Sequence, residues 1–313
     1  MSKIRPAAAL TEHRIAYRSG KKFSDEFLLF TFVIPALVLF CTFFIYPSVG
    51  SVYYSLTDWH GLEKTINFVG LQNYLRILQD EVLYTALKNT FLLVIVVTIL
   101  QNTIALALAV ALNGNIKTRN ILRTVFFLPA VMSTLSVGYI WSYIYNPIDG
   151  ILNTFLNKIG LDFLCNDWLG NADIALGSIM VIIIWQNAGY SMVIFLAGLQ
   201  SISSVYYEAS VIDGASSFQK FRHITIPLIA PAMTVNILLS VIGGMKTFDV
   251  IYATTGGGPG YETETFASML FSKTFTGLNE YGYGTAIAVV LFLMILTISQ
   301  LLTKFLRKRE IEA

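Results

Sequence analysis

The side chains that could carry out catalysis are few in this chain, and their spacing does not bring them together. His13, His60 and His223 fall in three separate polar segments, and neither an HExxH nor a CxxC pattern occurs, so we expect no metal site. The glycine-rich run Gly256–Gly260 lacks the lysine and the serine or threonine of a phosphate-binding loop and predicts a turn. The sequence therefore predicts a protein that is not an enzyme and holds no cofactor of its own.

More informative polar residues interrupt an apolar run. In WQNAGYSM, the side chains of Trp185, Gln186, Asn187 and Tyr190 point to different faces of one predicted helix. Such a helix either lines a cavity or makes hydrogen bonds with neighbouring helices, and both interpretations stay open. Because aromatic faces and amides are the groups that hold sugar rings, these four residues are candidates for a solute path.

Two charged residues, Lys246 and Asp249, end another apolar run. Three residues apart on one helix, they would share a face and could form an ion pair. They are either an interfacial pair with snorkelling side chains or the mouth of the same polar path. We include both among the candidates for that path.

The polar segment Glu208–Pro227 lies between two apolar runs. Its sequence, EASVIDGASSFQKFRHITIP, predicts two short helices over Tyr206–Ile212 and Ser217–Ile224. Asp213 and Gly214 form a tight turn between them, in which the glycine is free to take a positive φ. Pro227 is expected to begin the next long helix, where its missing amide proton costs little.

On the second short helix, Phe218 and Phe221 lie close to one face with Arg222 or Ile224. This layout gives an aromatic ridge beside basic residues. A docking element for a partner protein has this form, although a helix lying on a membrane surface would have it too.

The elements that carry these residues are predicted from composition. Hydrophobic residues make up 55% of the 313 residues, charged residues 13%, and the mean hydropathy is +0.64, which is typical of a membrane protein. Several charge-free runs exceed the roughly 20 residues that cross a bilayer as a helix. We predict an all-α, polytopic membrane protein with six transmembrane helices, over 27–49, 89–112, 123–145, 174–198, 227–248 and 282–304. Kinks are expected near Pro35, Pro129 and Pro231.

Lysine and arginine counts predict the orientation of these spans. Fifteen of the twenty-one basic residues fall in the first tail, the second and fourth connecting segments and the last tail, so those parts are expected to be cytoplasmic. The first apolar run is followed by tyrosines instead of a small-residue cleavage site, which indicates an uncleaved helix. The predicted organisation is a cytoplasmic tail 1–26, a transmembrane domain 27–304 with a cytoplasmic loop 200–227, and a cytoplasmic tail 305–313.

The loop resembles that of a known family, the integral-membrane permease subunits of binding-protein-dependent ATP-binding-cassette importers. Their pattern is E-A-A, three residues, G, nine residues, I, any residue, L-P, and this chain keeps every spacing from Glu208 to Pro227. Ser210 replaces the second alanine and Ile226 the leucine. The resemblance implies that Glu208 anchors the loop to an ATPase, Gly214 permits its bend, and Phe218 and Phe221 fill a cleft of the ATPase. The residues that it assigns to coupling are Glu208, Ala209, Ser210, Asp213, Gly214, Ala215, Phe218, Phe221, Ile224 and Pro227.

Further motifs look like the carbohydrate-uptake, maltose-type branch of this family. They are NFVGLQNY at 67–74, RTVFFLPAVMS at 123–133, DGILN at 149–153, TGGGP at 255–259 and SLTDW at 55–59, the last resembling the first of two permease partners. The resemblance implies the type I importer permease fold, a bacterial plasma membrane location and alternating access driven from outside the chain. It also implies four kinds of contact: a second permease in a heterodimer, two cytoplasmic ATP-binding subunits that hold ATP and Mg, an extracytoplasmic solute-binding protein, and membrane lipid. No nucleic-acid partner is expected.

Two alternatives are kept. The same permease architecture could import glycerol phosphate or a polyol, although the few cationic residues in the predicted spans argue against a phosphorylated solute. A stand-alone secondary transporter would leave the docking loop without a purpose.

Overall fold

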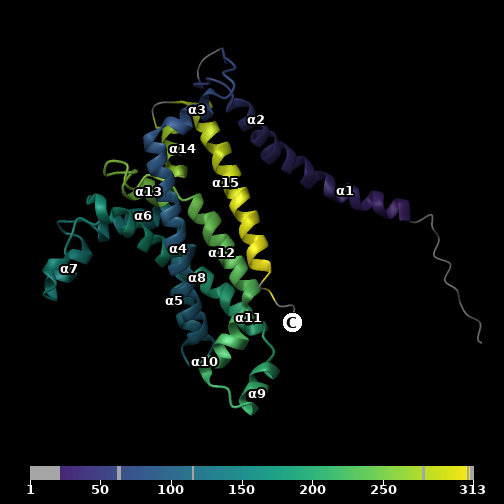
Figure 1. The fold of residues 1–313 in the computed structure, drawn as a ribbon, viewed down its shortest axis with the longest axis vertical. Coiled ribbons are helices and arrows are strands. Elements are labelled where there is room, and N and C mark those ends of the chain that lie inside the picture. The colour runs from purple at the N-terminus through teal and green to yellow at the C-terminus, as the bar shows by residue number, and fades with distance from the viewer. Residues whose placement is uncertain (1–21, 62–64, 115, 277–278, 309, 311–313) are drawn as a thin grey trace, which may run out of the picture. The chain divides into compact units, whose positions relative to one another are not determined.

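The computed structural model describes residues 22–61, 65–114, 116–276, 279–308 and 310, and the described residues are nearly all helical (Figure 1). The predicted all-α class is confirmed. The helices before the long loop are α1 Lys22–Phe40, η1 Cys41–Ile45, α2 Tyr46–Tyr54, α3 Gln72–Gln79, α4 Glu81–Asn113, α5 Arg119–Val131, α6 Thr134–Ile144, α7 Ile151–Lys158, η2 Asp162–Leu164 and α8 Ala172–Ser201. Those of the loop and after it are α9 Ser204–Ile212, α10 Ser217–Lys220, η3 Phe221–Thr225, α11 Ile226–Leu228, α12 Ala230–Met245, α13 Asp249–Thr254, α14 Phe266–Phe275 and α15 Tyr281–Arg307.

The chain divides into two compact units, one ending at Gly50 and the other beginning at Ser51. The described part of the first unit is one continuous helical run through α1, η1 and the start of α2. Side chains 31–49 of this run are exposed and mostly apolar, as expected of a helix whose solvent is lipid.

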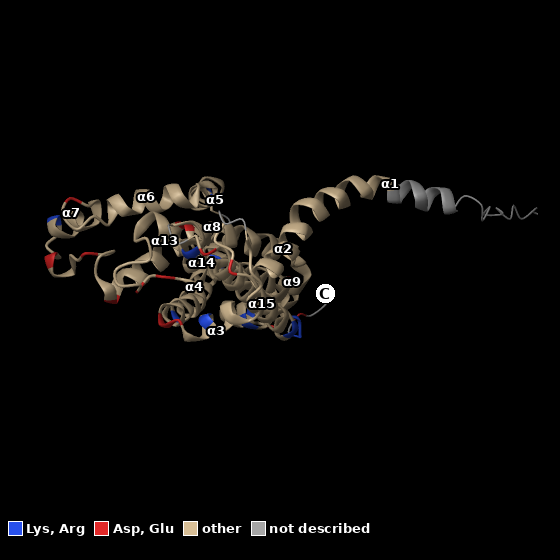
Figure 2. Cartoon of the chain, turned by 90° about the horizontal axis from the view of Figure 1, so that it is seen from above, with Lys and Arg blue, Asp and Glu red and all other residues tan. Residues whose placement is uncertain are grey.

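Four helices are long and apolar enough to cross a membrane singly, namely Thr31–Tyr54, α4, α8 and α15. They correspond to the first, second, fourth and sixth predicted spans, with ends shifted by several residues. Figure 2 shows the charged residues of the described chain mainly at helix ends and loops, while most of the helical ribbon carries none. This distribution agrees with helix bodies embedded in hydrocarbon.

The third predicted span is wrong as a single helix. Residues 123–145 belong to α5 and α6, which meet at an angle of 99° after a break at Met132 and Ser133. The kink expected at Pro129 is thus a complete interruption three residues later. Composition could not show it, because the apolar run continues through the break.

The fifth predicted span is also divided. The helical path from Ser217 to Leu228 bends by 67° at Ile229, and the long helix α12 begins only at Ala230. Pro227 therefore does not start the long helix as predicted; Pro231 takes that position in the first turn of α12. At the other end α12 stops at Met245, short of the predicted residue 248.

Within the second unit, α4 and α8 pack along each other, and α12 packs against α4, α8 and α15 (Figure 1). The close contact of α8 with α5 depends on Gly189, because a methyl group built there would overlap the carbonyl oxygen of Phe126. Helices α3 and α14 lie at one end of this unit and α9 and α10 at the other (Figure 1). The packing thus holds a rigid group of long helices between two sets of short ones.

Two of the motifs that resembled the permease family pack together at the α3 end. Asp58 accepts hydrogen bonds from the backbone and side-chain nitrogens of Asn67, at 2.8 and 2.9 Å, and the side-chain bond in particular holds the pKa of Asp58 below its usual range. Asn73 donates to the carbonyls of Ser55 and Thr57. The SLTDW and NFVGLQNY motifs are therefore two halves of one hydrogen-bonded structure.

The glycine-rich loop between α13 and α14 is held by a buried carboxylate. Glu264 is 5% exposed and accepts a hydrogen bond of 2.9 Å from the Ser268 hydroxyl. Burial raises the pKa of Glu264, with the Ser268 bond opposing it more weakly. The side-chain amide of Asn89 donates to the carbonyls of Glu262 and Glu264 and so fastens the loop to α4.

The raised pKa of Glu264 makes stability depend on pH. The folded protein holds the proton of Glu264 more tightly than the unfolded chain does. The contribution of this proton to the free energy of unfolding is therefore fully present below the ordinary pKa of 4.5, and it is lost as the pH rises through the raised pKa. We expect Glu264→Gln to leave Tm unchanged at pH 4 and to raise it at pH 8, by about 2–4 °C for each kcal/mol regained. Thermal unfolding in detergent at both pH values measures this, with the exposed Glu262→Gln as control. An equal Tm shift at both pH values would contradict the expectation.

Candidate functional site

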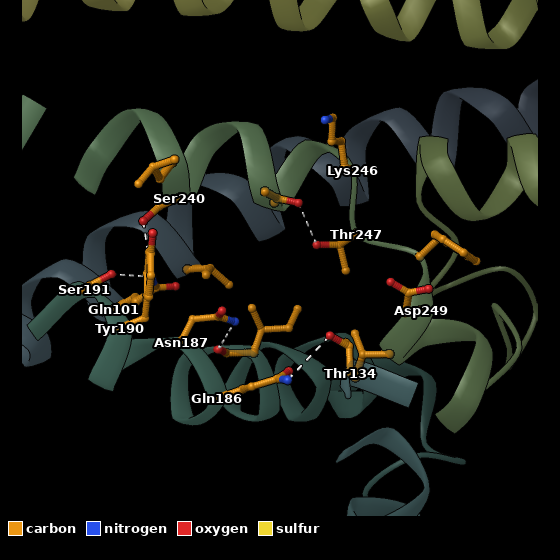
Figure 3. Close-up of a pocket in the computed structure, with 17 residues that line it drawn as sticks. Gln101, Thr134, Gln186, Asn187, Tyr190, Ser191, Ser240, Lys246, Thr247 and Asp249 are labelled. Atoms are coloured by element: carbon orange, nitrogen blue, oxygen red, sulfur yellow. Dashed lines mark hydrogen bonds between the residues drawn. The ribbon is translucent and has the colours of Figure 1, made fainter. Parts of the chain in front are cut away.

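A polar cavity of about 380 Å³ lies among α4, α8 and α12, beside the start of α6 and the segment that joins α12 to α13 (Figure 3). Five of the six residues predicted for a solute path line it, and they are Gln186, Asn187, Tyr190, Lys246 and Asp249. The sequence interpretation in which α8 lines a cavity is therefore supported for these residues.

Trp185 is the candidate that the structure places elsewhere. Its ring meets that of Trp141 edge to face, with centroids 5.5 Å apart, and it is not part of the cavity wall. It faces the α6 side of α8, one position round the helix from Gln186.

Gln186 also supports the second interpretation, hydrogen bonding between helices. Its side-chain amide donates to the carbonyl of Met132 at 3.2 Å and lies 3.5 Å from the Thr134 hydroxyl (Figure 3). Met132 follows the last residue of α5 as its C-cap, so its carbonyl has no helical partner beyond the break. Gln186 thus satisfies the backbone where the helix is interrupted and borders the cavity at the same time.

The predicted shared helix face of Lys246 and Asp249 is wrong. α12 ends at Met245, residues 246–248 are not helical, and Asp249 begins α13. The ion pair found among the described residues joins Arg76 and Glu280, not these two. In Figure 3 the ammonium group of Lys246 lies away from the carboxylate of Asp249, so the cavity border carries one charge of each sign on separate elements.

A polar cluster at the other side of the cavity was not predicted. The side-chain nitrogen of Gln101 donates to the hydroxyls of Ser191 and Ser240, at 2.8 and 3.3 Å, and so joins α4, α8 and α12 (Figure 3). Asn236, one turn before Ser240, donates to the carbonyl of Ser191 at 3.1 Å. A sequence signal did exist, because a glutamine on one apolar run and an asparagine and serine four residues apart on another are unusual in membrane helices.

The cavity wall can hydrogen-bond a polar solute with many hydroxyl groups. The side-chain nitrogen of Asn187 donates a hydrogen bond of 2.9 Å to the carbonyl of Ile183, and the side-chain oxygen of Asn187 remains as an acceptor. Tyr190 is 46% exposed and presents an aromatic ring to the same space. The hydroxyl of Thr247 donates to Gly243. Amides, hydroxyls and a ring together provide directional bonds and an apolar contact surface.

The second candidate site is the helical loop from α9 to α11. The predicted turn is confirmed: Gly214 has φ +70°, and the Ala215 amide donates to the carbonyl of Ser210 at 2.9 Å. Ser216 then caps α10 in a reciprocal capping box with Gln219. Two short helices joined by a tight turn result, as the sequence predicted.

Side-chain bonds fix the two arms of the loop against each other. The Tyr207 and Thr225 hydroxyls lie 3.0 Å apart, and the buried Ser210 donates to the carbonyl of Tyr207 at 2.6 Å. Phe221 is half-buried and faces Tyr207 and the ends of α4 and α8. Phe218, in contrast, is 68% exposed. The two aromatic rings therefore do not form one outward ridge, since the helix turns Phe221 toward the body of the protein.

The outward surface of the loop combines exposed apolar side chains with the exposed acids Glu208 and Asp213. Val205, Ile212 and Phe218 are 65%, 87% and 68% exposed, and Glu208 lies one turn from Val205 on the same face of α9. Large apolar side chains exposed beside charged ones are typical of a surface that another protein covers.

The helical path that leads from the loop into the membrane domain continues through Pro227, so this proline does not end a helix. The amide of Ile226 donates to the carbonyl of Phe221, five residues back, in the π-helical turn η3. A proline cannot donate to the residue four back, and its ring crowds that carbonyl. The extra residue of the π turn relieves this conflict. The same arrangement occurs before Pro47, where Tyr46 donates to Cys41.

Comparison with known proteins agrees with this architecture. A probable ABC transporter permease protein of Pyrococcus horikoshii is 38% identical over 268 residues, covering 85% of this chain and 91% of that protein. The multiple sugar-binding transport system permease protein MsmF of Streptococcus mutans is 33% identical over 294 residues, covering 93% and 99%. The crystal structure of a bacterial ABC transporter involved in the import of the acidic polysaccharide alginate contains a chain with the same fold, with a TM-score of 0.80 at 23% identity, covering 92% and 98%.

The family described as binding-protein-dependent transport system inner membrane component matches residues 101–311, which include the α9–α11 loop and every residue that lines the central cavity except Val97. This match extends over about two-thirds of the chain. The chain belongs to this family of inner-membrane transport components and is a multi-pass membrane protein.

Proposed function

We propose that this chain is the permease subunit of an ATP-binding-cassette importer and that it carries a sugar or oligosaccharide through the cavity among α4, α8 and α12. The observation that carries the proposal is that five predicted path residues line one polar cavity. This cavity lies along the half of α12 that is farther from the α9–α11 loop. The names of its relatives support a carbohydrate, since one is a multiple sugar-binding system permease.

The loop α9–α11 is proposed as the contact with a cytoplasmic ATPase. Its apolar outer surface around Glu208 supplies the docking area, and Gly214 sets the angle of the two arms. When the ATPase subunits close around ATP and Mg, the loop moves as one piece and α12 moves with it, changing the access of the cavity from one side of the membrane to the other.

The family match and the relatives support the remaining parts of the proposal. The chain has six spans if each bent helix pair crosses once, and both tails and the loop lie in the cytoplasm of a bacterium. A second permease completes the pathway, two ATP-binding subunits drive it, and an extracytoplasmic solute-binding protein delivers the sugar. Uptake of labelled sugar into proteoliposomes that contain the whole assembly tests this proposal. Uptake that continues without ATP and stops with an ionophore would instead identify a secondary transporter.

Gly214 provides a test of the coupling loop. Its φ of +70° is unfavourable for any side chain, and Gly214→Trp adds a large group on the docking side. We expect sugar uptake to fall at least about tenfold while membrane insertion is retained, measured in membrane vesicles. Gly160→Trp is the matched control, because Gly160 has φ +77° and equally open surroundings but lies at the end of α7. Equal loss of uptake in both variants would argue against coupling.

The apolar loop surface gives a second test. Ile212→Ser removes an apolar side chain that is 87% exposed, so the fold of this chain should be unaffected while binding of the ATPase weakens. We expect at least a fivefold loss of ATPase subunit in pull-downs. Ile148→Ser changes a residue that is 91% exposed between α6 and α7 and should retain the ATPase fully. Undiminished capture by Ile212→Ser would place the docking surface elsewhere.

Substitutions at Asn187 and Trp185 test which side of α8 forms the solute path. Asn187→Leu removes an amide from the wall and should lower the rate of sugar uptake at least about tenfold, with assembly and basal ATPase activity retained. Trp185→Leu alters a ring outside the wall and should change uptake by less than about threefold. Uptake assays at several sugar concentrations measure both, and the reverse ranking would assign the path to the Trp185 side of α8.

A further inference from the structure

A second cavity, distinct from the central one, forms a groove between α4 and α8. Its volume is about 470 Å³, and it lies where the two helices begin, at the end of the domain opposite the α9–α11 loop. The lining residues follow one face of each helix at intervals of four, through Lys88, Leu92 and Val96 on α4. The groove therefore runs along the helices and not across them.

The groove is charged at one end and apolar beyond it. Lys88 and Asp173 are the last charged residues before the charge-free stretches 89–116 and 174–207, so they mark the depth at which the hydrocarbon begins on both helices. Glu262 joins them at the same end from the loop fastened by Asn89. Below this rim the lining is apolar.

The apolar part of the groove is open. Val96 lies eight residues beyond Lys88 and Met180 seven beyond Asp173, which places them about 12 Å and about 10 Å past the rim at about 1.5 Å for each residue. Leu176 and Met180 are buried and form the floor, while Gly177 leaves space, since a methyl group built on it meets no atom within 4 Å. A narrow apolar chain can lie in this space and cover the floor.

The rim carries charges of both signs without partners in the described chain. Lys88, Asp173 and Glu262 are exposed, and the ion pair that the described residues form involves none of them. One ammonium group beside two carboxylates matches a headgroup that itself contains a phosphate and an ammonium. A phosphate with no cation would meet Lys88 favourably but also two carboxylates.

We propose that this groove binds one aminophospholipid of the phosphatidylethanolamine type, from the leaflet on the side of α3 and α14. Lys88 holds the phosphate, Asp173 and Glu262 hold the ammonium, and the upper part of one acyl chain lies along Leu92, Gly177 and Met180. The charged headgroup of the lipid thus lies at the charged rim, and its apolar chain lies along the apolar part of the groove. The inference requires a membrane location, which the family establishes, and does not depend on the solute that is transported.

Lipid binding to the full-length chain in its assembled form, followed by native mass spectrometry, tests the proposal. Phosphatidylethanolamine should bind at least tenfold more tightly than phosphatidylglycerol, which has the phosphate but no ammonium. Gly177→Leu fills the groove and should reduce phosphatidylethanolamine binding at least tenfold, and Lys88→Ala should do the same. Asp173→Asn, a change on the surface, should reduce the preference between the two lipids. Lys158→Ala, at an exposed lysine on α7, is the control and should bind as the unchanged protein does.

Three results would overturn the inference. One is equal binding of phosphatidylethanolamine by the unchanged chain and by Gly177→Leu. Another is equal affinity for both lipids with Asp173 intact. The third is a Gly177→Cys variant that crosslinks to another polypeptide of the assembly, because the groove would then be a contact between proteins. Loss of sugar uptake plays no part in these outcomes, so failure of the proposed transport function and failure of the lipid site are distinguishable.

Discussion

Within a bilayer, a helix that stops exposes backbone groups which no water can satisfy, and the region around the cavity is arranged by that constraint. Two helices stop there, α5 at Val131 and α12 at Met245. Gln186 donates to the carbonyl of Met132, and the Thr265 hydroxyl donates to the carbonyl of Thr247 at 2.8 Å. Thr134 and Thr247, beside these two interruptions, both line the cavity. The polar space is therefore a consequence of where the helices end, and Gln186, which satisfies the backbone at the first interruption, also forms part of its wall.

The same constraint explains how movement at the loop can reach the cavity. From Ser217 to Leu228 the helical path is unbroken, because the π turn η3 accommodates Pro227. It bends at the buried Ile229, and α12 then carries Asn236 and Ser240 to the polar cluster with Gln101. A rigid arm, a fixed bend and a helix that ends at the cavity form a mechanical link. Shifting α12 along α4 would exchange the hydrogen-bond partners of Gln101, which is a change between discrete arrangements and not a gradual one.

Sequence reasoning succeeded where structure is decided locally. The turn at Gly214, the two short helices on either side of it and the existence of long apolar helices depend on a few neighbouring residues or on composition. It failed where tertiary packing decides. The apolar run 123–145 gives no sign of the break at Met132, and nothing near Lys246 shows that α12 has already ended.

Choosing the face of α8 that lines the cavity was the hardest step for the sequence. This helix is buried on most of its circumference, so polar and apolar residues occur all round it. A pattern that lacks one polar face cannot say that Gln186 and Asn187 border the cavity while Trp185, next to them, packs on Trp141. Only the positions of the neighbouring helices show which of these three side chains border the cavity.

The pair α4 and α8 separates the two cavities of the domain. Along α4, Val96 lines the outer groove and the adjacent Val97 lines the central cavity. Along α8, Met180 belongs to the groove and Ile183, one turn on, to the cavity. Because closely packed helices move as units, a molecule that widened the groove would alter the separation or tilt of the wall that the solute meets. A molecule in the groove therefore touches the same two helices that border the solute cavity, without touching the solute itself.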